Sequence, residues 1–139
     1  MQVIEQPPSA SRKQVLVGRY LTGFAVLFMT FDGVTKVVRE PHSVQATTIQ
    51  LGFPPSAVPW IGVLLLACAV VYLIPRTAPI GALLLTAYLG GAVAANVRVN
   101  DPAFETIFPI LFAILIWAGL LLRDERLRRL LLRRTAAAR

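Results

Sequence analysis

Two charged residues, Asp32 and Lys36, lie near the end of residues 15–38, which are otherwise almost continuously apolar. Their spacing of four residues places both side chains on one face of a helix, where they can form an ion pair. A charge inside a membrane span is costly, so it faces protein or water and has a partner. Two interpretations remain open at this point: a structural ion pair, or a site that handles a ligand or a proton.

Further polar residues follow the third apolar segment of the chain. In an antiparallel bundle these residues would lie at the same end as Asp32 and Lys36. Arg98 has forked donors suited to an anionic headgroup or substrate, or it can simply anchor the end of its helix. We therefore predict an outward-facing polar pocket. Its candidate residues are Asp32, Lys36, Asn96, Arg98, Asp101 and Glu105.

Residues typical of self-sufficient catalysis are scarce. The chain has one cysteine, Cys68 in an apolar run, and one histidine, His42. A disulfide within the chain and a zinc site of cysteine and histidine ligands are therefore excluded. No phosphate-binding loop and no nucleophile elbow is present. We predict no catalytic residue and no metal, and the sequence leaves open whether the protein is an enzyme.

The composition indicates a membrane protein. Of the 139 residues, 56% are hydrophobic and only 15% are charged, and the mean hydropathy is +0.67. Soluble domains carry about 25% charged residues. The length leaves room for one small membrane domain.

Four apolar segments can be distinguished, at residues 15–38, 59–74, 78–97 and 107–122. Because the turn between the second and third segments is tight, these two must be antiparallel. Between the first two segments, helical spacing over residues 44–51 predicts a short surface helix that ends at Gly52. The predicted fold is all-α: an antiparallel bundle of four transmembrane helices, with this short helix in the first outer loop. Its parts are a disordered cytoplasmic tail (1–14), the bundle (15–122) and a basic cytoplasmic tail (123–139).

The third segment carries small residues at helical spacing. Such residues allow the close backbone approach that holds helices together in lipid. We predict that they pack this helix against its neighbours, so that Gly90→Leu damages folding more than a change at residues 83–85. The packing residues are Ala82, Thr86, Gly90, Gly91 and Ala94.

Basic residues predict the orientation. Three lie at or near the N-terminal tail, one in the turn at Arg76 and seven in the C-terminal tail, against three on the other side. Both termini should therefore be cytoplasmic. In the C-terminal tail, Leu127, Leu130 and Leu131 alternate with arginines, a pattern typical of a helix on anionic lipid headgroups. Docking of a cytoplasmic protein is the second interpretation, and no nucleic-acid module is present.

Residues 18–122 resemble the DoxX-like family of small bacterial membrane proteins, most specifically in PRTAPIGALLLTAYLGGAVA at residues 75–94. The resemblance implies a four-helix bundle in the bacterial inner membrane. The wider group includes subunits of thiosulfate:quinone oxidoreductase. The resemblance therefore implies an accessory or partner-docking subunit of a quinone-linked redox system, with a redox partner protein and quinone as cofactor. The alternative is a binder or transporter of a small molecule or lipid headgroup that uses the polar pocket.

Overall fold

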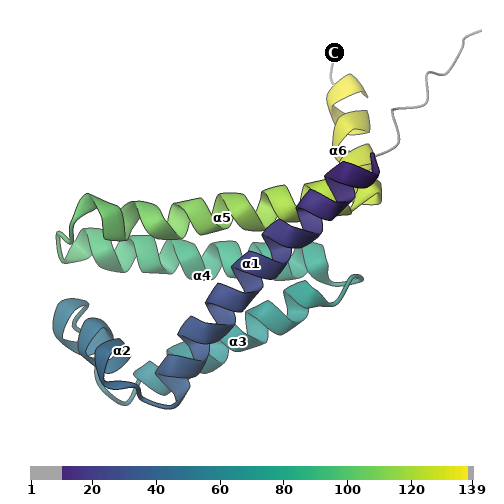
Figure 1. Cartoon of the computed structure of the whole chain (residues 1–139). Helices are drawn as coiled ribbons and strands as arrows, with labels where there is room; N and C mark the ends of the chain where they lie inside the picture. Colours follow the sequence, from purple (N-terminus) through teal and green to yellow (C-terminus); the bar gives the residue numbers. More distant parts are fainter. Residues whose placement is uncertain (1–10, 138–139) are drawn as a thin grey trace, which may run out of the picture.

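The structure, a computed structural model, describes residues 11–137, with side chains described for residues 11–131. This part of the chain is helical between short loops and contains no strand (Figure 1). In chain order the elements are α1 (Arg12–Val37), α2 (Pro41–Gln45), the π-helix η1 (Ala46–Gln50), α3 (Val58–Leu73), α4 (Ala78–Arg98), α5 (Ala103–Arg123) and α6 (Glu125–Ala137).

Three of these helices, α1, α4 and α5, are long and apolar enough to cross a membrane. Helix α3 is also apolar but has 16 residues, which span roughly 24 Å, less than the ~30 Å hydrocarbon core of a bilayer. The prediction of an all-helical chain with helices able to span a membrane is thus confirmed. The second apolar segment, residues 59–74, forms this shorter helix.

The starts of α1 and α5 are set by residues outside the apolar runs, so hydropathy predicted both starts a few residues too late. Ser11 and Gln14 form a capping box, in which each side chain accepts a hydrogen bond from the other's backbone N–H. Helix α1 therefore begins at Arg12, so residues 12–14 of the predicted disordered tail are helical. Residues 1–10 of that tail lie outside the described residues. Helix α5 begins directly after Pro102, four residues before the predicted start of its segment, with Glu105 in its first turn.

The turn between α3 and α4 is as tight as predicted. Ile74 adopts an extended conformation with ψ 119°, as the residue before a proline prefers. Thr77 Oγ1 donates a hydrogen bond to the Val71 carbonyl at 2.8 Å, and Pro79 occupies the first turn of α4. The chain thus reverses between two packed helices, and Figure 1 shows α4 and α5 side by side after the next turn.

Helices α1, α3, α4 and α5 enclose one hydrophobic core. Helix α1 packs against α3 and α5, and α4 packs against the same two helices. Tyr72 of α3 is the largest fully buried side chain. The core residues are Ala25, Val26, Met29, Leu65, Cys68, Tyr72, Ala78, Ala82, Leu85, Leu89, Phe112, Ile116 and Leu120.

The predicted packing face of α4 is only partly correct. Ala82 is buried and Thr86 is half-buried, but Gly90, Gly91 and Ala94 are exposed. A Cβ on Gly90 or Gly91 would meet nothing within 4 Å. The prediction that these three residues bring α4 against its neighbours within the chain is therefore wrong. The close approach occurs at Gly81, where a Cβ would overlap the backbone of Tyr72.

The loop after α1, where a short surface helix was predicted, contains two joined helical pieces, α2 and η1. Glu40 caps α2, and Pro41 occupies its first position. The hydroxyls of Thr47 and Thr48 donate to the carbonyls of Ser43 and Val44, bonds that accompany the wider winding of η1. Gly52 follows with φ 72°, the left-handed conformation that commonly ends a helix.

Candidate functional site

The predicted ion pair forms at the end of α1. Lys36 Nζ lies 2.5 Å from Asp32 Oδ1, and 15% of the lysine and 36% of the aspartate side chain are exposed. The pair is intrahelical, as its spacing predicts. Because each charge neutralises the other, the pair reduces the cost of placing both near an apolar region.

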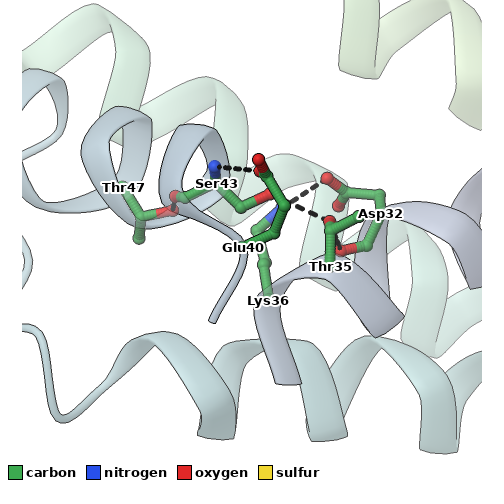
Figure 2. A network of polar contacts seen from close by, with 6 residues as sticks. All are labelled: Asp32, Thr35, Lys36, Glu40, Ser43 and Thr47. Carbon is green, nitrogen blue, oxygen red and sulfur yellow. Dashed lines mark hydrogen bonds and ion pairs between the residues drawn. The ribbon is translucent and has the colours of Figure 1, made fainter. Parts of the chain in front are cut away.

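A network of polar side chains surrounds this pair and joins α1 to α2 (Figure 2). Thr35 Oγ1 donates to the Asp32 carbonyl at 2.8 Å, and Ser43 Oγ donates to Thr35 Oγ1 at 2.9 Å. Thr47 is buried and donates to the Ser43 carbonyl at 2.7 Å. We call Asp32, Thr35, Lys36, Glu40, Ser43 and Thr47 the polar cluster.

Glu40 belongs to this cluster as the cap of α2. The backbone N–H of Ser43 donates a hydrogen bond to Glu40 Oε2 at 2.9 Å. That bond, followed by a backbone bond from His42, lowers the pKa of Glu40 below its usual value. A charged carboxylate is favoured here because the first N–H groups of a helix lack partners within it.

Asn96 and Arg98 tie α4 to two other segments. Asn96 is buried and donates through Nδ2 to the Glu105 carbonyl at 2.6 Å, across the turn between α4 and α5. Arg98 Nη2 donates to the Leu51 carbonyl at 2.5 Å, just after η1. Both side chains therefore act on backbone groups and not on the ion pair.

Asp101 and Glu105 stand apart from the polar cluster. Asp101 is half-buried and Glu105 is exposed, and neither side chain forms an ion pair or hydrogen bond within the described residues. The six predicted pocket residues thus divide into an ion pair, two backbone anchors and two carboxylates without a partner. A hollow of about 370 Å³ lies elsewhere, along α1, and is apolar. Phe24, Leu27, Phe28 and Phe31 line it.

These observations limit the chemistry of the site. Among the described residues, no group of three or more histidine, cysteine or acidic side chains could hold a metal ion. Cys68 is buried in the core and His42 is exposed in α2. The geometry provides a neutralised charge pair with hydroxyl groups beside it, at one end of an apolar helix bundle.

A model of the DoxX-like family matches residues 20–119, most of the chain. The chain belongs to the DoxX-like family. No curated protein and no solved structure matches it. The matched range includes the ion pair and the other four predicted site residues, and it ends before α6.

This DoxX-like protein contains a tyrosine on the inner side of α4 that sequence reasoning missed. Tyr88 is half-buried and packs against the hydrophobic core. Its hydroxyl forms no hydrogen bond within the described residues. Tyr88 lies one residue from the buried Leu89 and three from the buried Leu85. That spacing is the one signal that could have placed it on the inner face of α4.

A second missed tyrosine, Tyr72, organises the opposite end of this DoxX-like bundle. Its hydroxyl donates to the Ile116 carbonyl of α5 at 2.8 Å and lies 3.4 Å from Thr22 Oγ1 of α1. The Arg123 guanidinium lies 5.0 Å from its ring centroid and donates to the Tyr72 carbonyl at 3.2 Å. Tyr72 thus connects α1, α3 and α5 at one point.

Proposed function

We propose that this protein crosses the bacterial inner membrane four times as an antiparallel bundle, with both termini in the cytoplasm. Three helices have the length and hydropathy of spans, and α3 packs between α1 and α4. A short span can be accommodated by thinning of the bilayer around it. The excess of basic residues near the termini and at Arg76 supports the orientation.

Within that membrane, the protein acts as an accessory subunit that docks with a redox partner protein in a quinone-linked system. One observation carries this proposal: most of the reactive side chains near the ion pair are engaged in structural bonds. Asp32 and Lys36 neutralise each other, and Asn96 and Arg98 bind backbone carbonyls. The catalytic groups would therefore come from the partner. The link to redox chemistry comes from the resemblance to the wider DoxX group.

A quinone would be held by Tyr88 and by phenylalanine rings of α1 and α5. A quinone ring needs an apolar, aromatic-lined place and a hydrogen-bond donor for a carbonyl oxygen. The hydroxyl of Tyr88 has no partner within the described residues, and Phe28, Phe108 and Phe112 pack ring against ring between α1 and α5. Tyr88 would donate to the carbonyl oxygen. When bound, the quinone would accept or donate the electrons that the partner handles.

The test is to purify the full chain from bacterial membranes in mild detergent and record absorbance and native mass spectra. We expect a second polypeptide with the absorbance of a redox cofactor, and a quinone in the complex. Tyr88→Phe should lower the quinone content and leave the second polypeptide in place. A chain that purifies without a redox polypeptide and without quinone overturns the proposal.

A second candidate function is a binder or transporter of a small molecule or lipid headgroup. It is favoured by the exposure of Asp32, which keeps 36% of its side chain accessible despite its partner. A ligand could reach that carboxylate without first breaking the ion pair. In this case native mass spectra should contain a stoichiometric small molecule or lipid, and Asp32→Asn should remove it while the chain still folds.

The basic C-terminal segment has its own proposed partner. Seven arginines follow Leu122, on the side that the orientation above assigns to the cytoplasm. The inner leaflet of the membrane is negatively charged and attracts such segments. We therefore assign anionic lipid headgroups as the partner of this segment, in preference to a cytoplasmic protein.

A further inference from the structure

Helix α6 changes direction sharply from α5. Asp124 breaks the helix with φ −106° and ψ 95°. Its Oδ1 then accepts hydrogen bonds from the backbone N–H groups of Arg126 and Leu127, at 3.0 and 3.1 Å, and so caps the new helix. Figure 1 shows α6 leaving the end of α5 across the direction of α4 and α5. If those helices cross a membrane, α6 is directed along its surface.

The beginning of α6 is held against the bundle at two points. Arg123, immediately before the break, stacks over the Tyr72 ring and bonds to the Tyr72 carbonyl. Leu127, in the first turn of α6, packs against the hydrophobic core. Because Tyr72 is fully buried, its contact with Arg123 links the α5–α6 junction to the interior of the bundle. The position of α6 is therefore fixed at that end.

The apolar side of α6 continues past the bundle. Leu127, Leu130 and Leu131 share one side at the three- and four-residue spacing of a helix. Leu127 is half-buried, whereas Leu130 and Leu131 are 65% and 47% exposed. The apolar side of α6 begins against the core of the bundle and is exposed beyond it. If the bundle spans a membrane, this exposed part would contact acyl chains at the edge of the bilayer.

The charged residues of α6 occupy two other positions. At 100° per residue, Arg126 and Arg128 flank the leucine side, and Glu125 and Arg129 lie opposite it. Glu125 and Arg129 form an ion pair at 2.6 Å on the side directed away from the leucines. Arginines beside an apolar side extend to headgroup phosphates, while the ion pair faces water.

We propose that α6 is an interfacial helix that binds anionic phospholipid, with Leu130 and Leu131 in the acyl boundary and Arg126 on headgroup phosphates. This deepens the proposed function and rests on the membrane topology given there. A lipid surface is favoured over a soluble acidic partner because the leucine side continues directly from the core of the bundle, which fixes its depth at the bilayer edge.

The test places a fluorescent label on Leu131→Cys in a Cys68→Ala background, with the full chain in phosphatidylcholine nanodiscs that contain or lack phosphatidylglycerol. We expect phosphatidylglycerol to protect the label from a water-soluble quencher, and salt to weaken that protection by screening. Arg126→Gln should reduce the ratio of protected to accessible label about fivefold, the effect of one basic residue at an anionic surface.

Arg129→Gln is the matched control, since it removes the same charge from the water side. It should change the protection much less than Arg126→Gln does. Equal effects of the two variants would overturn the proposal, because net charge alone would then explain the attraction. So would a label that is equally accessible in both lipids, or one protected only when a soluble acidic protein is added.

A second label distinguishes this proposal from the topology on which it rests. Leu83→Cys, in the same background, lies at a position 60% exposed on α4 and should be inaccessible to the quencher in both lipids. If that label is protected and the one at position 131 is not, the α6 proposal fails and the spanning bundle stands. If the label at position 83 is quenched, both fail.

Discussion

The two ends of the bundle are closed by different means. At one end, which holds the polar cluster and the turn between α4 and α5, side chains bond to each other and to loop carbonyls, as Arg98 does at Leu51. At the other end, around the turn between α3 and α4, Tyr72 is fully buried and Gly81 brings two backbones together. We call these the cluster end and the tyrosine end.

This difference bears on where the molecule can move or bind. Close packing leaves few alternative arrangements, so the tyrosine end should open only with the whole bundle. The cluster end is held by a few hydrogen bonds to short segments, and regions of that kind open at lower free energy. Binding of a ligand is therefore expected at the cluster end, where Asp32 lies, while the tyrosine end serves as the fixed support.

The largest expected effect tests the packing of the tyrosine end. Gly81→Ala should lower the free energy of unfolding by about 1–3 kcal/mol, because the added methyl overlaps the Tyr72 backbone. Gly90→Ala is the matched control on the same helix, with open space at its Cβ, and should leave stability unchanged or slightly raised. The measurement is thermal unfolding in detergent. Similar losses from both substitutions would contradict the assigned orientation of α4.

The next effect tests the cluster end. Asp32→Asn leaves the half-buried Lys36 ammonium without its partner and should lower stability by about 1–2 kcal/mol, between the values for exposed and buried pairs. The double variant Asp32→Asn with Lys36→Gln removes both charges and should recover most of the loss. The same unfolding assay measures both. If the single variant kept full stability, the ion pair would not support the fold.

A smaller effect is expected from the hydroxyl of Tyr72. Tyr72→Phe keeps the ring that Arg123 contacts and the backbone beside Gly81, but it removes the hydrogen bond to the Ile116 carbonyl. The expected loss is about 1 kcal/mol, typical of a hydrogen bond between helices in a membrane. Tyr20→Phe, at an exposed position, is the control and should be neutral. A neutral Tyr72→Phe would mean that ring packing alone closes this end.

The smallest effect is a pH dependence at the cluster end. Because its backbone hydrogen bonds lower the pKa of Glu40, the carboxylate stabilises α2 above the pKa it has in the unfolded chain. That stability is lost as the pH falls through the lowered folded pKa. The protection of the Ser43 amide against hydrogen exchange, taken relative to the intrinsic exchange rate at each pH, should therefore fall as the medium is acidified below the usual range of a glutamate. In Glu40→Gln this additional pH dependence should be absent.

The helices could be predicted from the sequence more closely than their ends. Apolar runs located α1, α3, α4 and α5, and Pro75 marked the turn after α3. The starts of α1 and α5 differed by three and four residues, because Ser11 and Pro102 set them and not hydropathy. The helical spacing over residues 44–51 gave no sign of the π winding of η1, where the hydroxyls of Thr47 and Thr48 bond to backbone carbonyls.

The candidate site was predicted unevenly. The Asp32–Lys36 pair followed from spacing, because both residues are on one helix. The partners of Asn96 and Arg98 are backbone carbonyls of other segments, which no residue pattern reveals. Tyr88 was missed, since an aromatic residue in an apolar run does not indicate which way it faces. The packing prediction for Gly90 failed for the same reason, because the sequence did not show that this residue lies on the outward side of α4.

The sequence by itself therefore determined where the apolar helices lie, the intrahelical ion pair and the separation of leucines from charged residues on α6. Only the tertiary structure decided which side of each helix faces inward, which glycine brings backbones together and which carbonyls the polar side chains bind. The reason is physical: hydropathy, capping and i, i+4 pairing depend on neighbours along the chain. The rotation of a helix about its own axis is set by side chains far away in sequence, through packing that leaves no local signal.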